Sequence, residues 1–483
     1  MDLRVIFFVL SRLVLASMGV VVVPLFLALC LGEGAWRDFA LTLGLSIFVW
    51  LYLMAHARRE VRDLSMREGI AITGLGWLII TVLGMMPFLF GGYLLPLDAA
   101  FESISGFTGT GATVFPSLAS LPQSILFWRS MTHWFGGLGI IVIFIALLPQ
   151  AGQSTVFMYN AESSIQGHDR VLPRLSAMTG VLFRLYAGLT LAAGGIFFLC
   201  GMDVLTAANH ALSTVGAGGF STFDESARAF HSPALEFFMA LFMFLAGGNF
   251  ALYYKVWKKG PAALKKNTEF RVYLVVVTVA ALLVAADLMH ARGVTPLTAL
   301  RYAVFQATSL STTGFVSADY DTWPAFSKGV LLLLMLMGGC AGSTASGLKV
   351  TRVVLLVKNA VAVVRETLHP HVVRPVRMNG HTVPVAALHR VGHFFFLYLL
   401  TLTAFALLFT LFGVPLFDAL GISVTTLGNI GPAFGVAGAT ETYAPFPGAM
   451  KAALCFEMLL GRLEILTPLV MLRPDFWRTR HPW

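Results

Sequence analysis

Long apolar stretches, each bounded by charged or turn-forming residues, constrain this chain more than any other feature. The hydrocarbon core of a bilayer is about 30 Å thick and needs about 20 apolar residues per helix. We therefore expect ten spanning helices, at residues 5–31, 39–55, 69–93, 124–149, 178–200, 234–257, 271–289, 327–358, 387–413 and 450–472. Only 12% of the residues are charged, whereas soluble proteins have about 25%, and this excludes a soluble enzyme.

The basic residues gather in alternate segments between these stretches. The chain has 33 Lys and Arg against 24 Asp and Glu, a net charge of +9. If the N-terminus is cytoplasmic, most of the basic residues fall on the inner side, in segments 56–68, 150–177, 255–271, 349–390 and the tail from Arg473. This distribution follows the positive-inside rule. It predicts that both termini are cytoplasmic, that the partner is the lipid bilayer, and that no nucleic acid is bound.

Four of the outer segments resemble one another. Each has an apolar start and a small-residue end: FESISGFTGTGAT at 101–113, NHALSTVGAGGFST at 209–222, FQATSLSTTGFVS at 305–317 and SVTTLGNIGPAFG at 423–435. Aligning Gly111, Gly219, Gly314 and Gly431 gives a repeat of roughly a hundred residues. A second set of glycines follows about 25 to 30 residues later, at Gly137, Gly248, Gly339 and Gly461.

The repeat predicts how the chain is divided. Each unit has a helix, a short descending helix, a glycine-containing strand and a second helix. The expected divisions are an N-terminal transmembrane helix pair at 1–60, a first repeat at 61–165, a second at 166–265, a third with a broken final helix at 266–375, and a fourth with the cytoplasmic tail at 376–483.

A non-helical strand at membrane depth indicates a cavity or a bound ion, because hydrocarbon does not satisfy free backbone groups. Four such strands around one axis supply converging carbonyl oxygens that replace the water shell of a cation. The short helices would direct their negative C-terminal ends at that ion. Asp98, Thr206 and Asp418 are candidate N-caps of these helices, and Thr295 followed by Pro296 is the candidate in the third unit.

Two further segments complete a resemblance: GGCAGSTASGLKVTR at 338–352 and LGRLEI at 460–465. With the four outer segments, they resemble the Trk/Ktr/HKT superfamily of cation transporters, most closely its TrkH branch, over nearly the whole chain. The resemblance implies an all-α polytopic membrane protein. In that fold an N-terminal helix pair precedes four membrane–pore–membrane repeats around a central ion pathway, with about ten spanning helices and four pore helices.

The resemblance also implies a function. TrkH-like proteins take up potassium across the bacterial inner membrane through a channel-like pathway. They are homodimers that work with a cytosolic nucleotide-binding regulatory subunit of the TrkA type. No cofactor is expected, and potassium is the transported ligand.

The backbone carbonyls of four short stretches would form the potassium filter. By resemblance these are Gly109, Thr110 and Gly111; Ala217, Gly218 and Gly219; Thr312, Thr313 and Gly314; and Asn429, Ile430 and Gly431. A glycine at Gly111, where some family members have serine, favours K⁺ over Na⁺. Gly109 stands where threonine is more usual, and Ser346 stands where glycine is common.

The eighth predicted span cannot be one straight helix, because small residues interrupt it near mid-membrane. They are Gly338, Gly339, Gly342, Ser343, Thr344, Ser346 and Gly347. By resemblance this segment is a mobile loop that closes the pathway below the filter, and the alternative is a flexible packing site.

Arg462 lies within the tenth predicted span, where a charge at the bilayer centre costs about 2.5 to 3.5 kcal/mol. It is either a gate charge beside the pathway or one half of an ion pair with an acid such as Glu464 or Glu457. Lys349 and Arg352 follow the broken segment. Their charge fits the positive-inside rule and also a docking surface for the regulatory partner.

Other classes of function remain open at this point. A symporter that couples K⁺ to H⁺ or Na⁺ needs a titratable group or second ion site in the membrane, for which His133, Asp287 and Glu457 are candidates. A membrane scaffold with a vestigial pore would not need four intact glycines. A membrane enzyme would need clustered catalytic residues, which the sequence does not indicate, so the chain is not expected to be an enzyme.

Overall fold

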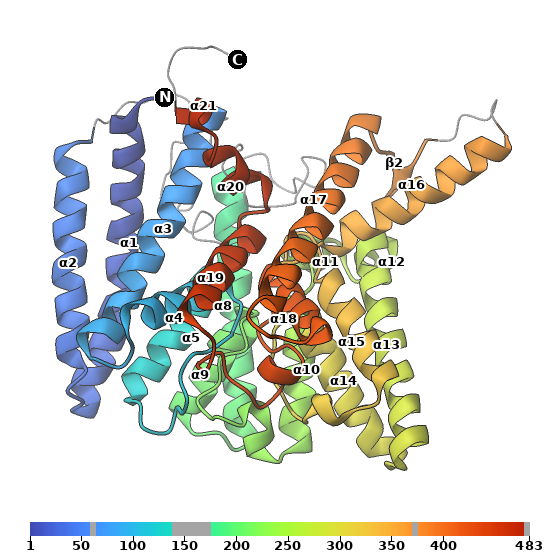
Figure 1. Cartoon of the computed structure of the whole chain (residues 1–483), viewed down its shortest axis with the longest axis horizontal. Coiled ribbons are helices and arrows are strands. Elements are labelled where there is room, and N and C mark those ends of the chain that lie inside the picture. The colour runs from blue at the N-terminus through green and yellow to red at the C-terminus, as the bar shows by residue number, and fades with distance from the viewer. Residues whose placement is uncertain (58–63, 138–174, 370–374, 478–483) are drawn as a thin grey trace.

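The computed structural model describes residues 1–57, 64–137, 175–369 and 375–477 (Figure 1). Within them the chain is almost entirely helical, as expected. The two short strands, β1 (Arg377–Met378) and β2 (His381–Thr382), pair antiparallel. The first two expected division points, after residues 60 and 165, lie outside the described residues.

The chain starts with two long helices, α1 (Leu3–Leu31) and α2 (Trp36–Ala55), which pack against each other and against α3. Asp2 caps α1 by accepting a hydrogen bond from the backbone N–H of Arg4, and Gly32 ends it in the left-handed conformation that favours glycine. The start of α1 lies at the same end of the molecule as α21 (Figure 1).

The remaining elements follow one order four times: a long helix, a short helix, an irregular strand and a second helix. The bounds are as follows: α3 (Met66–Phe90), α4 (Pro96–Thr108), α5 (Gln123–Gly137); α8 (Leu175–Leu199), α9 (Val204–Val215), η1 (Ser226–Phe230), α10 (Pro233–Ala246), α11 (Phe250–Lys259), α12 (Ala262–Lys266); α13 (Thr268–Arg292), α14 (Pro296–Thr312), η2 (Tyr320–Thr322), α15 (Ala325–Met337), α16 (Val350–Leu368); and α17 (Val385–Thr410), α18 (Leu416–Gly428), η3 (Gly435–Ala437), α19 (Gly448–Arg462), α20 (Leu466–Met471), α21 (Pro474–Trp477).

Six described helices are long and apolar enough to cross a membrane: α1, α2, α3, α8, α13 and α17. They agree with six of the ten predicted spans. The fourth predicted span, 124–149, is described only as far as Gly137, where α5 ends. The eighth predicted span is interrupted between Met337 and Val350, as its glycines predicted.

Two of the predicted spans, the sixth and the tenth, are not single straight helices. The sixth is bent by 93° between α10 and α11, because Asn249 leaves the helical conformation and caps α11 by accepting a hydrogen bond from Leu252 N. The tenth stops at Arg462, and α20 begins only after Glu464 and Ile465, both of which have positive φ. Hydropathy did not reveal these breaks, since both flanks are apolar.

The predicted caps of the short helices were wrong in three cases. Asp203, rather than Thr206, caps α9. Asp98 and Asp418 lie in the first turns of α4 and α18, whose N-cap residues are Leu95 and Pro415. An acid in the first turn still interacts favourably with the helix dipole. Thr295 and Pro296 occupy the predicted cap and first helical positions of α14.

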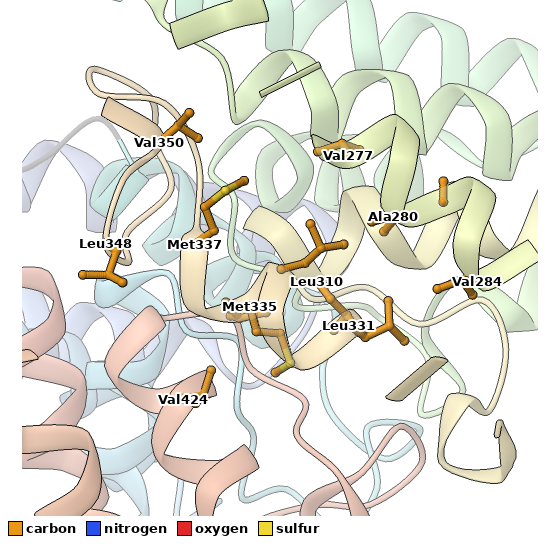
Figure 2. Packing of buried hydrophobic residues seen from close by; sticks show 14 of the residues in the cluster. Val277, Ala280, Val284, Leu310, Leu331, Met335, Met337, Leu348, Val350 and Val424 are labelled. Atoms are coloured by element: carbon orange, nitrogen blue, oxygen red, sulfur yellow. The ribbon is translucent and has the colours of Figure 1, made fainter. Parts of the chain in front are cut away.

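A large apolar cluster holds the third unit together (Figure 2). Val277, Ala280 and Val284 on α13 pack with Leu310 on α14 and with Leu331 on α15. The same cluster includes Leu348 in the interrupted segment, Val350 at the start of α16 and Val424 on α18. The interrupted segment is therefore attached to the core on both of its sides.

A buried ion pair joins α10 to α14. Arg301 contacts both carboxylate oxygens of Glu236, with its Nε at 2.6 Å and its Nη2 at 2.5 Å. The Glu236 side chain is 3% exposed and that of Arg301 is 28% exposed. Such a pair is costly to break because the remaining charge loses its partner.

We expect Glu236→Gln to lower the free energy of unfolding by about 2 kcal/mol, since it leaves a half-buried guanidinium without a carboxylate. Thermal unfolding in detergent checks this. Glu441→Gln, at an exposed position, is the control and should leave the transition unchanged. Equal midpoints for the two variants would contradict the prediction.

Candidate functional site

The four aligned glycines all adopt the left-handed backbone conformation. Their φ angles are +79° at Gly111, +77° at Gly219, +99° at Gly314 and +111° at Gly431. Side chains are strained in this region and glycine is not. The residue type that defined the repeat is thus required by the local backbone.

These glycines contact one another's strands in a closed cycle. A Cβ atom added to Gly111 would overlap the carbonyl oxygen of Gly218, and one on Gly219 would overlap that of Thr313. In the same way, Gly314 lies against the carbonyl of Ile430, and Gly431 lies against that of Thr110. Each strand therefore adjoins the next in chain order, and the fourth adjoins the first, so that the four strands surround one axis.

The short helices end where these strands begin. Their last residues are Thr108, Val215, Thr312 and Gly428. Helix C-termini carry partial negative charge on their unpaired carbonyls. The arrangement therefore places four negative helix ends beside the ring of strands.

The first, second and fourth strands share one backbone conformation. Gly109, Ala217 and Asn429, each two residues before the glycine, are left-handed. The third strand differs, since α14 continues through Thr312 and Thr313 has φ −124°. Its helix ends two residues before Gly314, whereas the other short helices end three or four residues before their glycines, so Thr312 is helical rather than part of the strand.

Hydroxyl groups of the short helices hold the far ends of three strands. Ser105 Oγ donates to the carbonyl of Ala112 at 2.6 Å, and Ser309 Oγ donates to that of Phe315 at 2.5 Å. Thr425 donates to the carbonyl of Pro432 at 3.1 Å. In each case the acceptor is the residue directly after the glycine, so these bonds turn that carbonyl away from the axis.

The second set of glycines lets the following helices approach the short helices. A Cβ on Gly137 would lie 2.6 Å from the carbonyl oxygen of Gly216, and one on Gly461 would overlap that of Leu427. In the second unit Gly247, rather than Gly248, makes the contact with a short helix. A Cβ on Gly247 would overlap Thr312 at the end of α14 and also Tyr273. Gly339 instead lies against the carbonyl of Gly247.

The interrupted segment between α15 and α16 is docked against the bend between α10 and α11. Cys340 N donates to the carbonyl of Gly247 at 2.8 Å, and Thr344 Oγ1 donates to that of Ala246 at 3.2 Å. Phe250 N, at the start of α11, donates in turn to the carbonyl of Gly342 at 3.3 Å. The two helix breaks thus satisfy each other's backbone groups.

Glu269, on α13, is a residue that the sequence reasoning missed. It is 4% exposed and accepts a hydrogen bond from Ala341 N at 2.6 Å. Thr351, on the far side of the interrupted segment, also donates to it. Glu269 stands in a charged stretch, KKNTEFR at 265–271, where nothing in the sequence distinguishes it from the neighbouring charged residues.

Arg462 is in contact with the same segment. Its Nη1 donates to the carbonyl of Thr344 at 3.1 Å and to Ser346 Oγ at 3.2 Å. Its Nη2 donates to the carbonyls of Gly136 and Gly137 at the end of α5. The arginine therefore joins the interrupted segment to the first unit.

The two basic residues considered for partner docking lie partly inside the protein. Arg352 pairs with Glu464 at 2.7 Å, with its side chain 14% exposed, and its guanidinium lies 4.0 Å from the ring centroid of Phe394. Lys349 has φ +67° and donates to the carbonyl of Ala345. Their docking role stays a prediction.

The three candidates for a coupled ion lie in separate hydrogen-bonded groups. His133 Nδ1 contacts the carbonyl of Gly106, and Asp287 accepts from Ser327. Glu457 accepts from the hydroxyls of Ser423 and Thr426. Among the described residues no hydrogen bond joins any two of the three candidates.

The loops that follow the third and fourth strands add contacts that the sequence did not indicate. Tyr443 donates to the carbonyl of Gly431 itself at 2.9 Å, and Tyr320 donates to that of Ala433 at 2.8 Å. Asp321 accepts from the N–H groups of Gly435 and Ala439. Burial raises the pKa of Asp321 above its ordinary value, although these two hydrogen bonds oppose the rise.

Comparison with known proteins identifies the family. The family model described as "TrkH: Cation transport protein" matches residues 39–478. The chain belongs to the TrkH family. A relative from Salmonella typhimurium, named Trk system potassium uptake protein TrkH, is 35% identical, over 99% of this chain and 100% of the relative. Escherichia coli TrkG, another Trk system potassium uptake protein, is 30% identical over 93% of this chain and 90% of its own length.

A solved structure agrees with the fold. The crystal structure of the potassium transporter TrkH from Vibrio parahaemolyticus has a TM-score of 0.89 at 32% identity, covering 99% of this chain and 100% of that chain. The predicted family and the all-helical membrane fold are thereby confirmed, and the chain is a multi-pass membrane protein. A family of transporters also favours transport over catalysis.

Gly111→Ala should destabilise the protein more than Gly413→Ala. Both glycines have positive φ, +79° and +84°, so both substitutions carry the same backbone strain of about 1 kcal/mol. Only the Cβ at 111 overlaps a neighbouring carbonyl, whereas the Cβ at 413 would meet nothing within 4 Å.

Overpacking adds about 1 to 3 kcal/mol, which should appear as a lower thermal midpoint for the 111 variant in detergent. Indistinguishable midpoints would show that the ring of strands is not closely packed at Gly111.

Proposed function

We propose that this protein is a channel-like translocating subunit for potassium uptake across a bacterial inner membrane. The observation that carries the proposal is the closed cycle of contacts between Gly111, Gly219, Gly314 and Gly431 and the carbonyls of adjacent strands. Carbonyl oxygens around a narrow axis replace the hydration shell of a cation, and the neighbouring helix ends add negative potential. The relatives, which are named potassium uptake proteins, support K⁺ as the cation.

The ligands in this proposal are backbone carbonyls of the four predicted stretches. No group of three or more His, Cys, Asp or Glu side chains suited to a metal ion occurs in the part of the chain that the structure describes. Side chains therefore act by holding the backbone, as Ser105, Ser309 and Thr425 do. Selectivity would arise from the spacing and rigidity of the ring.

The gate in this proposal is the segment from Gly338 to Gly347, with Arg462 as the charge that holds it. The segment has three hydrogen-bonding neighbours from separate elements, which are the α10–α11 bend, Glu269 and Arg462. Arg462 bonds in turn to carbonyls of α5. α16 follows this segment directly in the chain. A shift of α16 would therefore pull the segment away from its neighbours and break several of these hydrogen bonds together. We propose that a cytosolic TrkA-type subunit produces this shift in a homodimer, with both termini of each chain in the cytoplasm.

Flux into proteoliposomes that contain this chain alone tests the proposed function. We expect passive K⁺ flux in excess of Na⁺ flux, unchanged by an imposed pH difference. Flux that requires or drives H⁺ or Na⁺ movement would instead establish symport, and absence of K⁺ flux under all gradients would overturn the proposal.

Arg462→Ala should raise the basal K⁺ flux, because it removes the side chain that joins Thr344 and Ser346 to α5. Two or more charge-assisted hydrogen bonds of about 1.5 kcal/mol each are lost, so an increase of about a hundredfold is expected. Arg365→Ala, at an exposed site on α16, is the matched control. Equal flux for the two variants would show that Arg462 does not restrain the gate.

A further inference from the structure

We propose that Arg129 and Glu102 are positioning residues that fix the spacing between the first and second filter strands and thereby set K⁺ over Na⁺ discrimination. The inference rests on the proposed function and names side chains that control it. Neither residue was among the sequence-predicted site residues. We call Arg129, Glu102 and Thr113 the filter clamp.

Arg129 connects two strands that lie far apart in the sequence. It lies on α5 and is 1% exposed. Its Nη2 donates to Thr113 Oγ1, two residues after Gly111, at 3.1 Å. Its Nη1 donates to the carbonyl of Ser221, two residues after Gly219, at 3.2 Å. One rigid guanidinium thus holds both strands at the position two residues after each glycine.

Glu102 anchors this guanidinium to the first short helix. Its Oε1 lies 2.7 Å from Arg129 Nε, and both side chains are almost fully buried, at 0% and 2% exposed. Glu102 also accepts hydrogen bonds from Val114 N at 3.0 Å and from Thr113. The carboxylate is therefore bonded to α5 and to the first strand, and it compensates a positive charge that would otherwise oppose cations nearby.

Aromatic rings fix the plane of the guanidinium. Arg129 Cζ lies 4.1 Å from the ring centroid of Phe220, which directly follows Gly219, and 5.5 Å from that of Phe115. Stacking of this kind needs the planar guanidinium, and the fork of donors needs its fixed geometry. A lysine would keep the charge and lose both properties.

Glu102 is the second residue of the first aligned segment, and the residues at this position in the next two segments are His210 and Gln306, which are not carboxylates. His210 contacts Ser221 Oγ at 3.0 Å, and the side-chain carbonyl of Gln306 accepts from Ser317 N at 3.3 Å. Each of these bonds joins a short helix to the strand of its own unit. Arg129 differs because it joins two units, so it can control the gap between their strands.

This gap matters because a carbonyl ring distinguishes K⁺ from Na⁺ by cavity size or by the stiffness of its ligands. In either case, a looser link between two of four strands should allow the smaller ion to be coordinated. We therefore expect Arg129→Lys to lower the ratio of K⁺ to Na⁺ flux about tenfold, a change equivalent to about 1.4 kcal/mol.

The experiment measures K⁺ and Na⁺ flux separately in proteoliposomes of the full chain. Glu236→Gln is the matched control, because it breaks another buried ion pair that has no contact with a filter strand. It should lower the thermal midpoint while leaving the flux ratio as in the unsubstituted protein. If the unsubstituted protein shows no K⁺ preference, the proposed function fails, whatever the variants do.

Two smaller substitutions keep the test decisive if Arg129→Lys does not fold. Thr113→Val removes the hydroxyl that links Glu102 to Arg129 with little change of volume, and Thr113→Ser retains it. The valine variant should lower the flux ratio about threefold, and the serine variant should restore it. A K⁺-selective unsubstituted protein whose ratio is the same in Arg129→Lys, or in Thr113→Val where the lysine variant does not fold, would overturn the inference.

Discussion

The central constraint on this structure is that backbone polar groups at membrane depth must find partners in the protein, in a bound ion or in water. The four strands depart from helical hydrogen bonding, and their carbonyls divide into two sets. Those of Ala112, Phe315 and Pro432 accept from hydroxyls on the short helices. The carbonyls one residue before each glycine lie against the glycine of the preceding strand, with the fourth strand preceding the first. The first set is satisfied by protein, and the second set is the one that the proposed function assigns to the cation.

The same constraint explains why the helix breaks occur together. A bend in α10–α11 exposes the carbonyls of Ala246 and Gly247, and the interruption after α15 supplies Thr344 and Cys340 N to bond with them. Arg462, at the end of α19, bonds with the carbonyl of Thr344 and with those that end α5. No break among these could form alone at low cost. Their mutual bonding makes a structure in which a movement of one element must alter the others.

The sequence predicted the elements whose cause is local. Gly111, Gly219, Gly314 and Gly431 were identified because four similar segments align on them, and the left-handed backbone at each explains why the residue is glycine. The span lengths followed from hydropathy. The bend at Asn249, the end of α19 at Arg462 and the cap at Asp203 were not predicted, since they depend on which hydrogen-bonding group is nearby in space. The partners of Arg462 and the roles of Arg129 and Glu269 were hidden for the same reason. Arg462 and Arg129 join residues from different units, and Glu269 bonds with residues of its own unit that are more than 70 positions away. One sequence does not show such contacts.

The departures from symmetry indicate what the ring requires. Gly109, Ala217 and Asn429 share a left-handed conformation but not a side chain, and the third strand reaches the same glycine contact although its helix ends nearer to the glycine than in the other units. The short-helix side chain that bonds to the strand of its own unit is a carboxylate at Glu102, an imidazole at His210 and an amide at Gln306. Backbone position is therefore kept around the axis while the means of holding it differs. A ring of carbonyls depends on where each strand lies, so unequal units can build a nearly fourfold ring, in which one arginine is shared by the first two strands.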